Sequence, residues 1–472
     1  MATINTTLGG TICAIATPAG SGGIAVIRVS GSKAIEICDT IFKAANKHKT
    51  IAMQPANTTL YGNLYDGEEV VDEVVATLFR NPHSFTGEDT VEIACHGSQY
   101  IQQRIITLLL SAGCRLAEPG EFTRRAFASG RIDLSQAEAV ADLIAATSAS
   151  AHRLAINQMR GQFSRRLADL RMQLLDFVSL IELELDFSEE DVQFADRTRL
   201  MSLVNEIGQE IGRLAHSFAV GNAIKNGVPV AIVGETNAGK STLLNLLVQD
   251  ERALVSDIHG TTRDVIEDTI TLRGTLFRFI DTAGIRETDD TIESMGIERT
   301  FGKLRQSDVA IWLIDSTTTQ GETLELAQRI LPLCDDKQLI IVFNKADILS
   351  DATALQTVQT SLQAMRPGTP ILHISAKKRQ GIEQLEEQLA QAAQLPTADN
   401  NDIIVTNARH HQALLLALDA INRVTEGLTQ GIPTDFIAQD IRECMHHLGE
   451  ITGQISTDEI LGSIFSRFCI GK

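Results

Sequence analysis

The sequence predicts a chain of several domains that combines an α+β region, a helical region and an α/β region. The chain has 472 residues, more than one hydrophobic core usually serves, so we expect about two to four domains. A middle stretch without proline has apolar residues at helical spacing. The stretch after it alternates strand-like and helix-like segments, which is typical of a mostly parallel sheet covered on both faces.

The first zone, residues 1–125, is predicted to be α+β. The Gly-rich turn Thr17–Gly23 with Arg28 could bind an anion or could be a plain hairpin. A polar cluster from Ser84 to Asp89 suggests a pocket without identifying a ligand. Short runs rich in β-branched residues predict four strands: Ile12–Ile15, Ile24–Val29, Val74–Phe79 and Val91–Cys95.

The second zone is helical and is interrupted by the third. We divide the chain into residues 1–125, 126–226, 227–392 and 393–472, with the α/β domain inserted between two parts of one helical domain. Residues 396–406 are predicted to be a linker, and two helices are expected around 407–428 and 434–452. One apolar stripe predicts an amphipathic helix: Leu167, Leu170, Leu174, Phe177 and Ile181.

Arginines are frequent in the first helical part. They belong either to a solvated helix face or to a face that contacts RNA, and the sequence alone leaves both open. They are Arg153, Arg160, Arg165, Arg166 and Arg171.

Charge and cysteine content restrict the class of protein. The formal net charge of −19 argues against nonspecific nucleic-acid binding by the whole surface, because phosphate contacts need clustered Lys and Arg. Seven scattered cysteines without a CxxC pair argue against a disulfide framework or a zinc site and favour a reducing cytoplasm. We expect no signal peptide and no membrane-spanning segment.

The α/β zone carries a phosphate-binding motif directly after a predicted strand. Gly234–Ser241 fits GxxxxGK[ST], in which glycines let backbone N–H groups surround a phosphate. Lys240 is expected to reach the β- and γ-phosphates, and Ser241 to bind Mg²⁺. The predicted strands of this zone are Val228–Val233, Phe277–Asp281, Val309–Asp315, Leu339–Phe343 and Ile371–Ile374.

Two further loops indicate guanine as the base. Asn344–Asp347 follows a strand, and the carboxylate of Asp347 can accept hydrogen bonds from guanine N1–H and the 2-amino group, which adenine does not offer. Ser375–Lys377 follows the last strand and can support the base through the backbone of Ala376.

The remaining nucleotide loops are a switch, Gly260–Asp264, and a metal and γ-phosphate loop, Asp281–Gly284. A threonine of the switch can close on Mg²⁺, and Asp281 can hold the Mg²⁺ shell. Ile285 stands where a water-positioning glutamine follows in some GTPases. An apolar side chain cannot orient water, so the nearby candidates are Arg286, Glu287 and Glu293.

The chain ends in Phe-Cys-Ile-Gly-Lys. Cys469 is either a free thiol in a frayed tail or a reactive cysteine whose pKa is lowered by Arg467 or Lys472. A lysine in the last place is atypical of a prenylation signal.

Taken together, these blocks resemble the MnmE (TrmE) family of tRNA-modification GTPases along nearly the whole chain. The resemblance rests on ATPAGSGGIAVIRVSG, SFTGEDTVEIACHG, PGEFTRRAFASGRIDLSQAEAVADLI, NAGKSTLLN, DIHGTTRD, DTAGIRET, NKAD and CIGK. It implies an N-terminal α+β domain that binds formyl-tetrahydrofolate and forms a homodimer. It also implies a discontinuous helical domain and an inserted Ras-like P-loop G domain.

The resemblance implies a potassium-activated, Mg²⁺-dependent cytoplasmic GTPase that works with MnmG. Together they would install an aminomethyl or carboxymethylaminomethyl group on carbon 5 of the wobble uridine of certain tRNAs, using a folate one-carbon unit. The alternative that remains is a ribosome-assembly or regulatory RNA-binding GTPase of the Era or Der kind.

Site residues follow from the resemblance by position. Arg28, Glu92, Arg131 and Lys472 match folate contacts, with Glu88 as a fallback for Glu92 and with Arg131 where many members have Lys. Cys469 matches the cysteine needed for tRNA modification but not for hydrolysis, and Glu293 matches the catalytic acid that orients water.

The metal and nucleotide positions follow in the same way. Asn237, Ser256, Ile258 and Thr261 match the potassium ligands, and Ser241 and Thr262 match the Mg²⁺ ligands. The implied GTP contacts, which include the catalytic Lys240, are Asn237, Ala238, Gly239, Lys240, Ser241, Thr242, Ser256, Asp257, Ile258, His259, Gly260, Thr261, Thr262, Asp281, Thr282, Ala283, Gly284, Asn344, Lys345, Ala346, Asp347, Ser375, Ala376 and Lys377.

Overall fold

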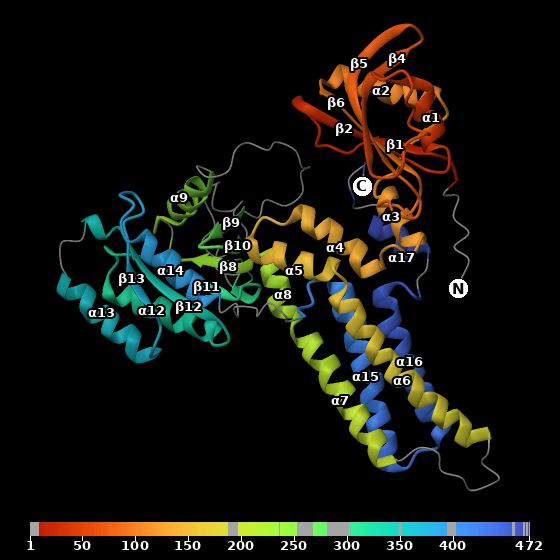
Figure 1. Ribbon diagram of the computed structural model, residues 1–472. Coiled ribbons are helices and arrows are strands. Elements are labelled where there is room, and N and C mark those ends of the chain that lie inside the picture. The colour runs from red at the N-terminus through yellow and green to blue at the C-terminus, as the bar shows by residue number, and fades with distance from the viewer. Residues whose placement is uncertain are drawn as a thin grey trace. The chain divides into compact units, whose positions relative to one another are not determined.

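The computed structural model describes most of the chain (Figure 1). Its contacts divide the chain into two compact units. The first unit comprises Met1–Ile144, Ile156–Ser202 and Ala420–Lys472, and the second comprises Ala145–Ala155 and Leu203–Asp419. The four-part division made from the sequence stays a prediction. The described residues are 9–186, 197–235, 237–252, 268–280, 302, 304–348, 352–393, 403–455, 458–465, 468 and 471.

The first unit contains a seven-stranded sheet in the order β3-β4-β5-β6-β2-β1-β7. Neighbouring strands are antiparallel except for β1 and β7, which are parallel. All four strands predicted for this zone are present. The strands are β1 Ile12–Ile15, β2 Gly22–Ser30, β3 Phe42–Ala44, β4 Thr58–Asp66, β5 Glu69–Phe79, β6 Thr90–Gly97 and β7 Arg115–Leu116.

Two helices supply the apolar core of this sheet. They are α1, Ala34–Ile41, and α2, Gln99–Ser111. Their buried residues join those of the strands in one cluster that includes Ile27, Ile93 and Leu109. Alternate strand residues face this core, as the two-residue period of a strand requires, so the zone is α+β as predicted.

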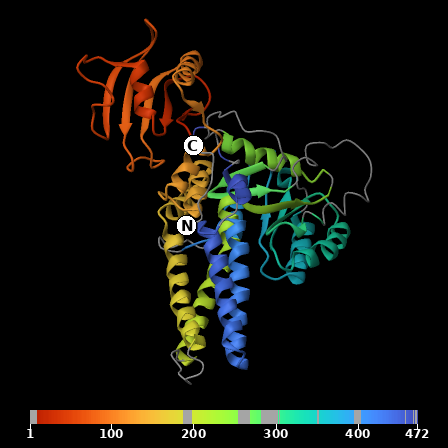
Figure 2. The ribbon, with the colours of Figure 1, turned by 90° about the vertical axis from the view of Figure 1, so that its right-hand side faces the viewer.

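Long helices form the rest of the first unit. The predicted stripe from Leu167 to Ile181 is buried on α6, which runs beside α16 in both views (Figures 1 and 2). The two helices expected near 407–428 and 434–452 are also present. The helices are α3 Glu121–Ala128, α4 Leu134–Ala145, α5 Ala149–Met159, α6 Gln162–Asp186, α15 Ala408–Gln430, α16 Thr434–Thr452 and α17 Asp458–Phe465. The unit boundaries fall within α5 and α15, at the last residue of α4 and near the start of α7, Arg197–His216.

The arginine run does not form one outward stripe. Arg153, Arg160 and Arg165 are exposed. Arg171 instead packs against α16, where its Nε donates a hydrogen bond of 3.0 Å to the carbonyl oxygen of Met445, and burial lowers its pKa. Arg171 therefore belongs to the helix–helix contact, and the two interpretations, a solvated face or a face that contacts RNA, stay open for the other four arginines.

The end of the chain returns to its beginning within the first unit. A Cβ added to Gly120 would lie 2.7 Å from the carbonyl oxygen of Phe465, and one added to Gly471 would lie 2.2 Å from that of Ile15. Both glycines have positive φ, of 66° and 100°. The C-terminal segment is thus packed tightly against α3 and the end of β1, in a conformation that favours glycine.

The second unit contains a six-stranded sheet in the order β13-β12-β11-β8-β10-β9. All neighbours are parallel except β9 and β10, which form an antiparallel hairpin. Buried residues of alternate parity, such as Ile232 and Val233, belong to two separate core clusters. The sheet is therefore mostly parallel and covered on both faces, as predicted.

The strands of this unit are β8 Val228–Val233, β9 Asp268–Leu272, β10 Thr275–Phe279, β11 Val309–Asp315, β12 Gln338–Asn344 and β13 Ile371–His373. The helices are most of α7 Arg197–His216, then α8 Phe218–Asn226, α9 Lys240–Arg252, α12 Gln320–Ile330, α13 Ala352–Met365 and α14 Ile382–Ala392. Two short 3-10 turns, η2 Leu331–Cys334 and η3 Ala346–Ile348, also belong to it.

Two further features concern disulfide bonds and membrane-spanning helices. Cys13, Cys38, Cys95, Cys114, Cys334 and Cys444 are free and buried. Cys469 lies outside the described residues. Within the described ranges, no helix has both the length and the apolar character that crossing a membrane would need.

Candidate functional site

The phosphate loop follows β8 and leads into α9, which begins at Lys240. The Lys240 ammonium donates hydrogen bonds to the carbonyl oxygens of Gly234, at 2.9 Å, and Glu235, at 2.6 Å. Asn237 and Gly239 have φ of 64° and 99°, the left-handed region that turns successive N–H groups inward. The loop therefore has the form of an anion cradle at a helix N-terminus.

Asn344 connects three loops of the predicted nucleotide site. Its buried amide donates a hydrogen bond of 2.8 Å to the carbonyl oxygen of Ala238 and accepts one of 3.0 Å from the backbone N–H of Ala376. A Cβ on Gly239 would lie 2.3 Å from Nδ2 of Asn344. Glycine at this position thus allows the phosphate loop to approach the guanine loop closely.

The carboxylate of Asp347 is held ready to accept hydrogen bonds. The Ser375 hydroxyl donates to its Oδ1 at 2.7 Å, and the Lys378 ammonium lies 3.7 Å from its Oδ2. The hydrogen bond from Ser375 lowers the pKa of Asp347, and the Lys378 charge acts in the same direction. A charged carboxylate is the form that can bind the two N–H groups of guanine.

The rest of the predicted nucleotide residues divide into two groups. Ser241 is half-buried and Thr242 exposed in the first turn of α9, and Lys377 is exposed beside the guanine loop. The others lie outside the described residues: Ser256, Asp257, Ile258, His259, Gly260, Thr261, Thr262, Asp281, Thr282, Ala283, Gly284 and Glu293.

The N-terminal sheet brings two predicted folate contacts together. Arg28 on β2 and Glu92 on β6 are direct cross-strand partners, and Nε of Arg28 donates to Oε1 of Glu92 at 2.8 Å. The Arg28 guanidinium also lies 5.5 Å and 5.6 Å from the ring centroids of Phe85 and Phe122. Both charged side chains are partly exposed, at 21% and 28%, so a ligand can reach them.

The other predicted folate contacts form no hydrogen bond or ion pair with Arg28 or Glu92 in the described part of the chain. Arg131 is exposed, and its Cγ would lie 3.3 Å from a Cβ on Gly87, which places it beside the loop that carries Glu88. Glu88 instead pairs with buried Arg125 at 2.8 Å, so Glu92 is the carboxylate nearer to Arg28. Lys472 lies outside the described residues.

The residue before Lys472 packs on the strand next to the one that carries Arg28. Gly471 packs on the carbonyl oxygen of Ile15, at the end of β1. β1 is the neighbour of β2, with Ala14 opposite Arg28. The packing of Gly471 thus brings the last part of the chain to the strand beside Arg28.

Comparison with known proteins gives the family. A model described as the MnmE helical domain matches residues 134–469, and one described as the GTP-binding protein TrmE N-terminus matches residues 11–131. A Bacteroides thetaiotaomicron protein named tRNA modification GTPase MnmE is 58% identical over 462 residues, covering 98% of this chain and 99% of that one. This chain belongs to the MnmE family. A relative of the same name from Christiangramia forsetii is 52% identical, over 98% of this chain and 100% of its own.

The MnmE matches account for the fold class predicted from the sequence. The N-terminal match covers the α+β sheet, and the helical-domain match begins before the G domain and ends after it. Among solved structures, Aquifex aeolicus Era bound to GDP.AlF4⁻ is 29% identical, covering 41% of this chain and 66% of that chain with a TM-score of 0.28.

Several residues that organise these MnmE sites were not found from the sequence. Asp315, at the end of β11, binds the Lys345 ammonium at 2.6 Å. Its signal was an acidic residue at the carboxyl end of a buried strand, where ligands gather in α/β sheets. Phe85 lies within the predicted polar cluster from Ser84 to Asp89 but was not singled out, and Phe122 carried no signal, because only the fold brings the two rings to Arg28.

Proposed function

We propose that this chain is a potassium-activated GTPase that acts in tRNA modification together with MnmG. Its product would be an aminomethyl or carboxymethylaminomethyl group on carbon 5 of the wobble uridine of certain tRNAs, with a folate one-carbon unit as the carbon source. The observation that carries the GTPase part is the Asn344 amide, which joins the phosphate loop to the two base loops. Family membership favours tRNA modification over the Era or Der alternative.

Each loop has a distinct part in hydrolysis. Lys240 would transfer its ammonium from the carbonyl oxygens of Gly234 and Glu235 to the β- and γ-phosphate oxygens when GTP enters. Asp347, already ionised, would select guanine. Glu293 would orient the attacking water, a task that Ile285 cannot perform.

The oxygen donors of the phosphate loop suit hard cations. Ser241, in the first turn of α9, would hold Mg²⁺ with Thr262. The exposed side chain of Asn237, at the positive-φ apex of the loop, would bind K⁺ with Ser256, Ile258 and Thr261. K⁺ at this position supplies positive charge where negative charge develops between the β- and γ-phosphates.

We expect GTP hydrolysis to be slow in sodium chloride and about 10-fold or more faster in potassium chloride at the same ionic strength. Na⁺ is smaller than K⁺ and fits a site of the same oxygen ligands poorly. Phosphate release measured in both salts checks this, with Asn237→Ala as the variant that should lose the difference. Equal rates in the two salts would remove the potassium assignment and leave the GTPase assignment intact.

The modification role is tested in cells that lack the chain. The pair of Arg28 on β2 and Glu92 on β6, with Gly471 packed on the neighbouring strand β1, supports a folate site in this sheet. Nucleoside mass spectrometry of tRNA should show loss of the modified wobble uridine and its return with the wild-type chain. Cys469→Ser should retain GTP hydrolysis but restore less than about 1% of the modified nucleoside, because a hydroxyl is a far weaker nucleophile than a thiolate.

The matched control is Cys444→Ser, which alters a buried cysteine of α16 outside the terminal CIGK motif. Full modification with Cys469→Ser would refute the role of that thiol. Unaltered tRNA in the deletion strain would refute the modification function itself. We also propose a cytoplasmic location and a homodimer, in keeping with the family.

A further inference from the structure

The segment Asp315–Thr318 lies between the two nucleotide loops of the G domain. It follows β11, and β11 pairs with β8 on one side and with β12 on the other. The phosphate loop follows β8 and the guanine loop follows β12. Because parallel strands end at the same edge of a sheet, the segment after β11 lies in the middle of the site. None of the nucleotide motifs includes it.

The segment is bound to the guanine loop by three contacts. Oδ2 of Asp315 lies 2.6 Å from the Lys345 ammonium. The backbone N–H and the hydroxyl of Ser316 both donate to the carbonyl oxygen of Asn344, at 3.0 Å and 2.6 Å. Lys345 has a φ of 63°, which is uncommon for a residue with a side chain and persists only where neighbouring groups hold it.

Asp315 is itself fixed in place. Its Oδ1 accepts hydrogen bonds from the backbone N–H of Thr317, at 3.0 Å, and from the Thr317 hydroxyl, at 2.8 Å. Burial raises the pKa of Asp315, but the hydrogen bonds from Lys345 and Thr317 outweigh it and leave the pKa lowered. Both carboxylate oxygens are therefore occupied, and the charged form is the stable one.

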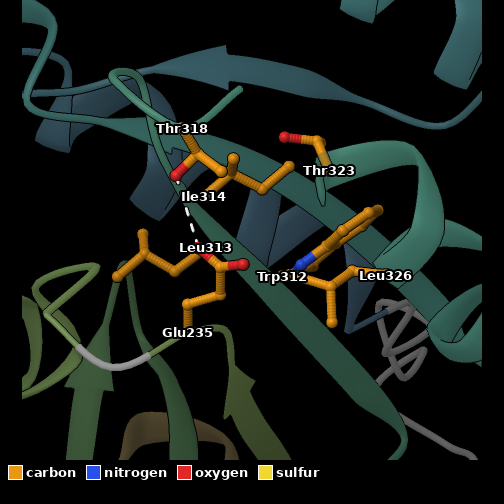
Figure 3. A pocket seen from close by; sticks show the side chains of 7 residues that line it. All are labelled: Glu235, Trp312, Leu313, Ile314, Thr318, Thr323 and Leu326. Carbon is orange, nitrogen blue, oxygen red and sulfur yellow. Dashed lines mark hydrogen bonds between the residues drawn. The ribbon is translucent and has the colours of Figure 1, made fainter. Parts of the chain in front are cut away.

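The same segment contacts the phosphate loop. The Thr318 hydroxyl donates to Oε2 of Glu235 at 3.3 Å, across a small cavity that Trp312 and Thr323 help to line (Figure 3). The backbone carbonyl of Glu235 accepts from Lys240. A Cβ on Gly234 would lie 2.1 Å from the carbonyl oxygen of Leu313, so the phosphate loop rests directly on β11.

We propose that Asp315 is a positioning residue for guanine-nucleotide binding, which acts through Lys345 and sets the guanine loop in register with the phosphate loop. Thr317 supports Asp315, and Thr318 makes the second link through Glu235. The inference rests on the proposed GTPase function. It assigns to Asp315 an effect on nucleotide affinity although Asp315 itself would contact neither the phosphates nor the base.

The test compares Asp315→Asn with Asp336→Asn, which removes the same charge from an exposed position (82%) on another loop. Titration with a fluorescent GDP analogue should show about tenfold weaker binding for Asp315→Asn, the size expected for one charge-assisted hydrogen bond. The KM for GTP should rise by a similar factor. The kcat at saturating GTP should stay within about twofold of wild type, because the catalytic groups are unaltered.

A second variant covers the case in which Asp315→Asn folds poorly. Thr317→Val removes one donor to Asp315 from an exposed residue and should weaken binding by about threefold. Asp315→Asn should weaken nucleotide binding less in a chain that already carries Lys345→Met than in the wild-type chain. The reason is that both substitutions remove the same contact.

The measurements distinguish a positioning role of Asp315 from a structural role and from failure of the proposed GTPase function. Unchanged nucleotide affinity in both variants would overturn the inference. A fall in kcat with unaltered KM, accompanied by a lower unfolding temperature of the nucleotide-free protein, would assign Asp315 a structural role and also overturn it. Failure of the wild-type chain to bind GDP would instead refute the proposed GTPase function.

Discussion

Asp347→Asn is expected to reverse the base preference of the G domain from guanine to xanthine. The carboxylate accepts two N–H groups from guanine, whereas an amide can accept only one with its oxygen and presents its own N–H₂ to the 2-amino group. Xanthine carries a carbonyl at that position and accepts from the amide. Loss of one charge-assisted contact and creation of one unfavourable contact should lower GDP affinity by about 10²–10⁴-fold.

The hydrogen bond from Ser375 should keep the substituted side chain in the position of Asp347. The Ser375 hydroxyl, 2.7 Å from Oδ1, can still donate to the amide oxygen of the variant, so the side chain should keep its orientation. Competition between fluorescent GDP and XDP analogues measures the preference, and Asp336→Asn is the control for loss of one negative charge. A variant that still prefers GDP would mean that another residue reads the base.

Glu293→Ala is expected to lower the kcat of GTP hydrolysis by about 10²-fold or more and to leave the affinity for GTP nearly unchanged. Ile285 occupies the place of a water-positioning glutamine, and we propose from the family resemblance that the Glu293 carboxylate orients the water instead. Water orientation contributes in the transition state and little to binding, which is why kcat and kcat/KM should fall together.

Single-turnover hydrolysis with saturating potassium measures this effect, and nucleotide titration confirms that GTP still binds. Glu287→Ala is the matched control, since it removes an acidic residue from the same segment and should retain nearly wild-type turnover. Turnover at the wild-type rate in Glu293→Ala, with a loss in Glu287→Ala or Arg286→Ala, would reassign the water-orienting group.

The position of the phosphate loop was predictable from the sequence because its chemistry is local. GxxxxGK[ST] must follow a strand and begin a helix, and Gly234–Ser241 does so between β8 and α9. The apolar stripe of α6 was predictable for the same reason, since burial of Leu167 and Leu174 follows from helical spacing alone.

Other elements depend on contacts that the sequence does not display. β4, Thr58–Asp66, was missed, and it contains Gly62, which weakens a strand signal. A Cβ on Gly62 would lie 2.3 Å from the carbonyl oxygen of Lys43, so the glycine serves a close approach between strands. The predicted strand Phe277–Asp281 is instead Thr275–Phe279. It begins earlier because the turn at Arg273 and Gly274, with φ of 50° and 81°, closes a hairpin with β9.

The proposed role of Asp315 in the nucleotide site also depends on contacts that the sequence does not display. Its neighbours in sequence are unremarkable serine and threonine, and its partner Lys345 is 30 positions away. Only the strand order β12-β11-β8 brings the two loops to either side of it. Arg171 is a similar case, because pairing of α6 with α16 decides that it faces a backbone carbonyl rather than solvent.

The packing of Gly471 on the end of β1 has a consequence for folding during protein synthesis. β1 is translated long before Gly471, its contact from the later part of the chain. Domains generally begin to fold from the N-terminus during synthesis, but this sheet cannot gain that contact until Gly471 has left the ribosome. A product truncated between the G domain and Gly471 would therefore contain every strand of the N-terminal sheet and still lack this contact.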